Sequence, residues 1–406
     1  MPNLAMLAAV LIASAGDRPD LTGTIVARGG GPVVGAHVLI DEAGARQGSS
    51  PLGPSAHADC GKRAETGPGG AFRIEEPDPA LLFRVLVVAE GFRPQFVERV
   101  DPARGPIRAE LVPFNVERVP ADRVIRGRVV DAAGLPVAGA TVEPLMFRTE
   151  EHSGFKPGVF DLLAVADLDG EFALVARSPI RDATIRVAGR GLAPRIFARQ
   201  APAPTPARYE LGPGAAVAGR LIGADGRPIG GVSVGLVQAN RSSDQFLGPL
   251  TIGTDGDGRF TFPNVGPGEA YFVYGIMASF GGRGAVAARR VAVGAEGSTA
   301  EMGDLAAEAG HKLGGQVLLA DGRPIPPGTR VLVGRAAAWD DLSALVDADG
   351  RFALAGLPTE QITLGVPVRG YRLSPRNKSL DTTNTFQLKG TVDADLTGLK
   401  VLLEPE

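Results

Sequence analysis

The sequence predicts an all-β protein built as a tandem array of four similar β-sandwich modules. Two turn signals recur in the same order four times along the 406 residues, first a Gly-x-Pro turn and then a Gly-x-Phe turn. The chain also contains 56 glycines and 33 prolines, which suits short strands joined by many turns. Beyond the amino-terminal apolar run no long helical periodicity appears, so we expect no parallel sheet with crossover helices.

Each module is expected to begin at a lead glycine inside a short apolar run. The lead glycines lie roughly 100 residues apart, a period that suits independent domains and is too long for solenoid repeats. They are Gly23, Gly127, Gly219 and Gly315. The predicted module ranges are 17–115, 120–212, 213–306 and 307–406. Short linkers, most clearly the alternating prolines of residues 201–207, predict a rod with little bending.

The first residues have the pattern of an export signal. Leu4–Ile12 is a compact apolar run, and Ala13-Ser14-Ala15 follows it as a cleavage pattern. We therefore expect residues 1–15 to be a signal peptide and the protein to be secreted, periplasmic or displayed at the cell surface. A buried first strand and a mis-assigned start codon are the alternatives. No later apolar run reaches the length of a membrane-spanning helix.

The ordered turns and strands resemble the carboxypeptidase regulatory-like domain family. Module two matches most closely, with Gly134-Leu-Pro136, Gly139-Ala140-Thr-Val142 and Asp169-Gly170-Glu-Phe172 in order. The resemblance extends over residues 20–405. It implies seven-stranded, Greek-key, transthyretin-like β-sandwiches that act as non-catalytic scaffold, adhesion or interaction modules. The nearby starch-binding-like sandwiches give the alternative of a carbohydrate-binding accessory protein.

Catalytic motifs are missing from the sequence, and we predict that the protein is not an enzyme. None of the four histidines begins the His-x-x-Glu pair of a zinc carboxypeptidase. The string around Ser233 resembles a nucleophile elbow but falls on a predicted strand. A formal charge of −3 without a dense Lys/Arg block argues against nucleic-acid partners. The expected partners are other envelope or extracellular proteins, with polysaccharide as the alternative.

Paired aspartates precede the second turn in three modules and leave two interpretations. They are Asp167 and Asp169, Asp255 and Asp257, and Asp347 and Asp349. An Asp-x-Asp-Gly string resembles the start of a calcium loop, although no Glu stands where the bidentate ligand is needed. In a hairpin turn, the same carboxylates would accept hydrogen bonds from nearby backbone amides. We predict no cofactor and keep calcium as the alternative.

The single cysteine, Cys60, excludes an intrachain disulfide. With His57 it forms a His-x-x-Cys pair beside Asp59, and two ligands alone do not make a zinc site. We interpret this stretch as a solvated loop with a free thiol, with a metal site as the alternative.

Trp339 is the candidate ligand-binding residue, because carbohydrate sites stack sugar rings on exposed aromatic side chains. A second aromatic group, residues 271–274 followed by Phe280, lies on a predicted strand where about half of the side chains face the core. Binding is also expected on the long loops at residues 46–65, 147–159 and 238–250. Residues 336–345 are expected to form one short helix.

Overall fold

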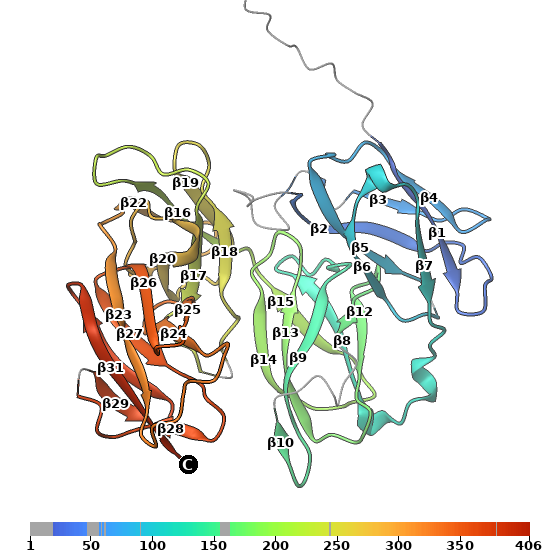
Figure 1. Cartoon of the computed structure of the whole chain (residues 1–406). Coiled ribbons are helices and arrows are strands. Elements are labelled where there is room, and N and C mark those ends of the chain that lie inside the picture. The colour runs from blue at the N-terminus through green and yellow to red at the C-terminus, as the bar shows by residue number, and fades with distance from the viewer. Residues whose placement is uncertain are drawn as a thin grey trace, which may run out of the picture. The chain divides into compact units, whose positions relative to one another are not determined.

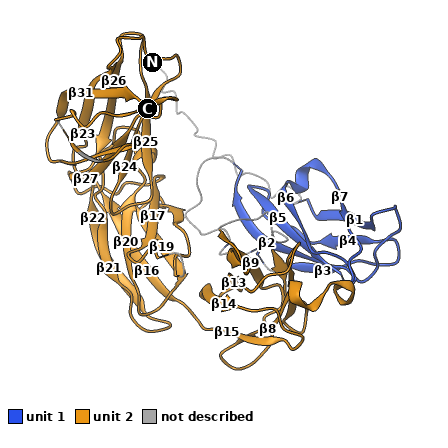
Figure 2. Cartoon of the chain, turned by 90° about the horizontal axis from the view of Figure 1, so that it is seen from below, with its two compact units in different colours: residues 1–46, 57–115 blue, residues 47–56, 116–406 orange. Residues whose placement is uncertain are grey.

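The computed structural model describes residues 19–46, 57, 59–60, 62–89, 91–154, 163–242, 245–378 and 380–406. The expected signal peptide lies outside these residues. The chain forms two compact units, which Figure 2 shows in different colours. One unit comprises residues 1–46 and 57–115, and the other comprises residues 47–56 and 116–406.

The first unit contains one seven-stranded β-sandwich in its described residues. Its strands are β1 (Leu21–Ala27), β2 (His37–Ala45), β3 (Arg63–Glu65), β4 (Ala71–Ile74), β5 (Leu81–Val88), β6 (Gln95–Val100) and β7 (Ile107–Leu111). One sheet has the order β4-β1-β7 and the other the order β3-β2-β5-β6. Strand β1 pairs antiparallel with β4 and parallel with β7, so the chain passes repeatedly between the sheets in a Greek-key path.

The second unit repeats this arrangement three times, as Figure 1 shows along the colour gradient. We call its three groups of strands modules two, three and four, and the first unit's sandwich module one. The strands of module two are β8 (Val124–Asp131), β9 (Thr141–Arg148), β10 (Ser153–Gly154), β11 (Ala164–Val165), β12 (Glu171–Val175), β13 (Asp182–Ala188), β14 (Arg195–Gln200) and β15 (Ala207–Leu211). Those of module three are β16 (Ala215–Ile222), β17 (Ser233–Gln238), β18 (Leu250–Gly253), β19 (Arg259–Val265), β20 (Ala270–Gly275), β21 (Arg289–Ala292) and β22 (Thr299–Ala306).

Module four carries additional strands. It contains β23 (His311–Leu319), β24 (Arg330–Arg335), β25 (Asp341–Leu345), β26 (Arg351–Leu357), β27 (Glu360–Gly365), β28 (Tyr371–Leu373), β29 (Asp381–Asn384), β30 (Gln387–Val392) and β31 (Leu396–Pro405). Strands β28 and β29 come from an insertion between β27 and β30 that the other modules lack. They extend the two sheets to the orders β26-β23-β31-β28 and β25-β24-β27-β30-β29.

The predicted fold class, a tandem array of Greek-key β-sandwiches, is confirmed. In each module the first strand pairs in parallel with the last, as β8 does with β15, β16 with β22 and β23 with β31. The count of seven strands expected from the family resemblance holds for the described parts of modules one and three, whereas the described parts of modules two and four contain eight and nine strands. The four module ranges stay a proposal, in which each range holds one pair of sheets.

The lead glycine of each module and the Gly-x-Phe turn meet in space, which explains why they recur together. Each lead glycine pairs across the sheet with the phenylalanine of the second turn, as Gly127 does with Phe172. A Cβ atom added to Gly127 would lie 2.2 Å from the Tyr209 ring and 2.5 Å from the Phe172 ring. The lead position therefore has to be glycine for the aromatic ring to lie over the strand.

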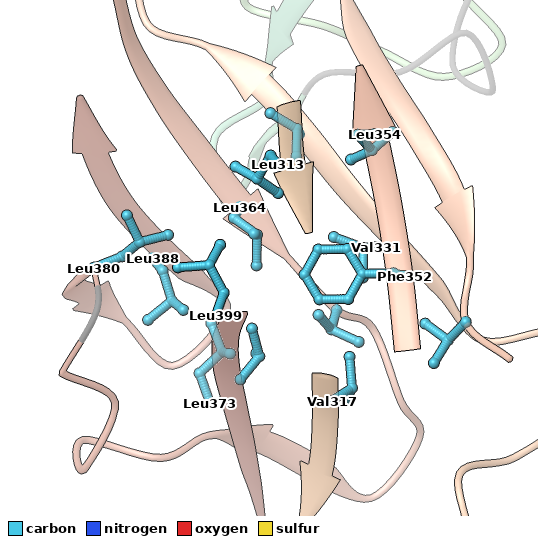
Figure 3. Packing of buried hydrophobic residues seen from close by; sticks show 14 of the residues in the cluster. Leu313, Val317, Val331, Phe352, Leu354, Leu364, Leu373, Leu380, Leu388 and Leu399 are labelled. Carbon is cyan, nitrogen blue, oxygen red and sulfur yellow. The ribbon is translucent and has the colours of Figure 1, made fainter. Parts of the chain in front are cut away.

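A separate hydrophobic core fills each sandwich. Figure 3 shows part of the core of module four, where Phe352 lies among aliphatic side chains from both sheets, including Val317, Val331 and Leu364. In module one, Cys60 belongs to the core and is 1% exposed, which corrects the interpretation of a solvated loop around this thiol. The buried thiol packs as a small apolar side chain.

The short helix expected at residues 336–345 is wrong. Asp341–Leu345 is strand β25, which pairs antiparallel with β24. Pairing with a distant strand decides the conformation here, because local propensity in so short a segment is weak. The helical segments among the described residues are 3₁₀ turns, namely η1 (Pro102–Arg104), η2 (Val116–Arg118), η3 (Ala121–Arg123) and η4 (Met277–Ser279). In this part of the chain no helix is long and apolar enough to cross a membrane.

The outer strands β6 and β14 share an irregularity. Arg99 in β6 and Arg199 in β14 have positive φ angles of 52° and 57°, which are uncommon for residues other than glycine. Each strand also shifts register against its inner neighbour, as a β-bulge does. The bulges interrupt the regular row of backbone groups on these outer strands.

Candidate functional site

The most elaborate polar cluster in the second unit lies where module three meets module four, and it centres on Arg335. The Arg335 side chain is 0% exposed at the end of β24. Its guanidinium donates hydrogen bonds to the backbone oxygens of Gly275 and Val286 in module three, each at 2.9 Å. A fully buried guanidinium requires this many acceptors, because leaving its charge unpaired would be very costly.

Two carboxylates of module four complete the surroundings of the guanidinium. Asp340 Oδ1 lies 3.2 Å from Arg335 Nη1, and Glu360 Oε1 accepts from Arg335 Nε. Both acids also accept from module three, since Asp340 bonds the Met277 amide at 2.9 Å and Glu360 the Ala288 amide at 3.2 Å. The guanidinium and both carboxylates of the network therefore each bond across the junction to module three.

Burial shapes the titration of this cluster. It raises the pKa of Asp340 above the ordinary value, and the Arg335 charge opposes that rise. Burial also raises the pKa of Tyr274 to about 12. The Tyr274 hydroxyl is enclosed beside the Trp339 backbone, without a hydrogen bond of normal geometry to any residue in the described ranges.

Apolar contacts surround the polar network. Val237, Tyr274 and Ala338 form a small core shared by the two modules, with Phe246 and Ile276 packed against it. Such a shared core, together with buried charges, favours one fixed arrangement of modules three and four over free movement about a linker.

Trp339, the candidate ligand-binding residue, lies at this junction and is 50% exposed. Its ring centroid lies 4.8 Å from that of Phe246, and the Arg241 guanidinium lies over the ring at 5.4 Å. Arg241 also donates to the backbone oxygen of Ala337 at 2.7 Å. The indole is thus engaged within the chain on one face, which leaves less of it for a ligand than the sequence suggested. The other aromatic candidates, residues 271, 274 and 280, are buried.

The loop at residues 238–250 contacts both neighbouring modules. Toward module four it contributes Arg241 and Phe246, as described above. Toward module two, its Leu247 oxygen accepts from Arg186 at 2.9 Å, while Arg186 also pairs with Glu143 at 2.6 Å. The loop was expected to bind a partner, and its described residues bind other modules of the same chain. The loops at 46–65 and 147–159 lie partly outside the described residues.

The paired aspartates act as turn residues in the structure. In every pair the first aspartate accepts two backbone amides through Oδ1, at distances from 2.7 to 3.0 Å. The first members are Asp167, Asp255 and Asp347, and the second members are Asp169, Asp257 and Asp349. This geometry matches the hairpin-turn interpretation. In the part of the chain that the structure describes, no three His, Cys, Asp or Glu side chains gather as a metal site requires.

Two other candidates, Ser233 and the stretch around His57, lie on a strand and among buried residues. Ser233 begins β17, as the strand interpretation predicted, and its amide donates to the Ser279 hydroxyl at 3.0 Å. His57 and Asp59 are buried, and Asp59 pairs with Lys62 at 2.7 Å. Burial lowers the pKa of His57.

Sequence patterns did not predict the Arg335 network, although a signal for it existed. Arg335 ends β24 and continues the alternation of Val331 and Val333, which are buried. A charged residue in such a strand predicts a buried partner, and Asp340 stands five positions later. The second acid, Glu360, comes from β27 and depends on strand pairing that no local pattern shows.

Hollows lie on the described part of the second unit. One, of about 510 Å³, lies between modules two and three and is lined by residues that include Arg195, Asn240 and Arg290. Another, of about 750 Å³, lies entirely within module four.

Comparisons with known proteins give no family for the chain. No protein-family model matches it, and neither does any curated protein. Similar solved structures include a streptococcal ancillary pilin, at 13% identity over 70% of this chain and 99% of that one, with a TM-score of 0.24. The minor pilin GBS52 of Streptococcus agalactiae is 14% identical over 47% of this chain and 96% of its own, with a TM-score of 0.26. The TIE protein of Bacillus anthracis is 8% identical over 92% and 69%, with a TM-score of 0.20. TM-scores this low are no evidence of a shared arrangement.

Proposed function

We propose that the chain is a non-catalytic, exported scaffold or adhesion protein whose modules are of the carboxypeptidase regulatory-like type. The observation that carries the proposal is the buried Arg335 network, which holds modules three and four together by charge, hydrogen bonds and a shared core. A structural role requires fixed spacing between modules, whereas an enzyme requires a pocket with converging catalytic groups. The partners would be other envelope or extracellular proteins.

The proposal is tested by small-angle scattering of the full chain and of Arg335→Met. A scaffold should give one well-defined scattering profile for the wild type. The variant should give a broader distribution of sizes, because its third and fourth modules move independently. Identical profiles from the two proteins would remove the rigid junction as an argument for a scaffold.

Export is tested separately by expressing the full chain with a carboxy-terminal tag and fractionating the cells. We expect the tagged protein outside the cytoplasm and shortened at its amino terminus. Recovery of the uncleaved chain from the cytoplasm alone would contradict an exported scaffold, whatever the rigidity of its modules.

A further inference from the structure

The hollow in module four is formed by the insertion that interrupts the repeat. It lies on the outer face of the sheet containing β24 and β27, and the segment 366–373 and the turn 385–387 wall it. Strands β28 and β29 belong to the same insertion. Insertions that add a concave surface to an otherwise repeated scaffold are where binding function is expected.

Two glycines lie in the floor of the hollow. Gly334 on β24 pairs with Thr363 on β27, and Leu332 pairs with Gly365. A Cβ atom added to Gly365 would lie 3.2 Å from the Phe386 backbone oxygen. The glycine therefore lets the turn at Phe386 lie close over the sheet, and a larger residue there would displace this wall of the hollow.

The rim of the hollow carries an unusually exposed aromatic ring. Phe386 is 69% exposed at the turn between β29 and β30, and Leu332 in the floor is 38% exposed. An exposed phenylalanine beside a flat apolar floor offers a surface for a ring-shaped partner with an apolar face.

Polar groups line the same space. Its charged side chains are two carboxylates, Asp341 and Glu406, and two guanidiniums, Arg369 and Arg372. Arg372 is already paired with a carboxylate, that of Glu404, at 3.0 Å. Carboxylates that accept and hydroxyl and amide groups that accept or donate suit a neutral ligand rich in hydroxyls.

We propose that this hollow binds a neutral sugar ring within a polysaccharide chain. A pyranose presents a flat face of C–H groups, which would lie on Leu332 and the Phe386 ring. Its hydroxyls would donate to Asp341 and bond with Thr363. A volume of about 750 Å³ is in the range of a small-ligand site and accommodates one or two sugar units.

The test is isothermal titration of the full chain with neutral hexasaccharides of glucose (α-1,4, β-1,3 and β-1,4 linked) and of β-1,4-linked xylose. We expect at least one to bind. Phe386→Ala should weaken that binding at least tenfold, and Gly365→Val should abolish it by displacing the turn that carries Phe386. Leu135→Ala is the matched control, since it removes a side chain that is 61% exposed in module two and should leave affinity within about twofold.

The proposal would be overturned by no binding of any of the four probes at millimolar concentration, by wild-type binding by Phe386→Ala, or by loss of binding in Leu135→Ala alone. Tighter binding of a hexagalacturonate than of every neutral probe would also overturn it, because the site would then select charge. Melting temperatures check that the variants are folded. If Gly365→Val does not fold, the result for Phe386→Ala decides the test. The scaffold proposal rests on Arg335 and would survive each of these results.

Discussion

Replacing Arg335 with methionine should destabilise the junction of modules three and four strongly. Methionine keeps much of the side-chain volume but removes the charge and the hydrogen bonds to the oxygens of Gly275 and Val286. It leaves Asp340 and Glu360, whose side chains are 6% and 12% exposed, without their cation. Breaking a buried ion pair by removing one partner costs about 3–5 kcal/mol.

The assay is urea unfolding followed by tryptophan fluorescence. Trp339 is the single tryptophan of the chain and lies on this junction, so its emission reports on the junction. Arg208→Met is the matched control, because Arg208 pairs with Glu210 at 3.0 Å with both side chains about half exposed. Such a surface pair contributes about 0–1 kcal/mol. A cost for Arg335→Met no larger than that of the control would refute the reasoning.

The same variant should respond to pH. Burial holds the pKa of Asp340 above its ordinary value, and loss of Arg335 removes the charge that opposes this rise. A carboxyl whose folded pKa is raised destabilises the folded state as the pH rises through that pKa. The deficit of Arg335→Met relative to wild type should therefore be smaller at pH 5 than at pH 8. An equal deficit at both values would show that Asp340 is not the group left uncompensated.

Three further predictions concern the modules themselves. Gly127→Ala should destabilise module two by about 1–3 kcal/mol, because the added methyl group would overlap two aromatic rings, whereas Gly256→Ala, in open space, should be nearly neutral; urea midpoints compare them. Asp167→Ala should cost about 1–2 kcal/mol through two lost hydrogen bonds to backbone amides, and equal losses from Asp169→Ala would contradict this division of roles. Burial raises the pKa of Tyr209 to about 12, so its stabilisation is complete below pH 10 and is lost as the pH rises toward 12. Absorbance titration of the native protein should show this tyrosine ionising well above pH 10, and a normal midpoint would count against its burial.

Local patterns were sufficient for the fold class and the turns. An aspartate three positions before the turn glycine stabilises its own hairpin, and the structure shows the Asp167 carboxylate accepting from two amides of that turn. The reason for the lead glycine was not accessible in this way. Gly127 is required by the rings of Phe172 and Tyr209, which approach it only after distant strands have paired.

The candidate site was harder to predict, because it depends on how modules contact one another. The exposure of Trp339 was correctly expected, but its partners Phe246 and Arg241 come from a loop of the preceding module. Likewise, the Arg335 network takes its acceptors from both modules. Contacts between separately folded modules leave no periodic signal, since each involves only a few residues from irregular segments.

The bulges at Arg99 and Arg199 affect how a chain of modules with a common strand order can fold. During synthesis, unfinished modules with the same strand order are present at high local concentration, and a strand of one can pair with the open sheet of the next. A left-handed arginine in β6 and in β14 makes these outer strands poor templates for a foreign strand. In module four, the position corresponding to β6 is covered by the additional strand β29. The irregular outer strands thus help modules one and two to select their own strands during folding.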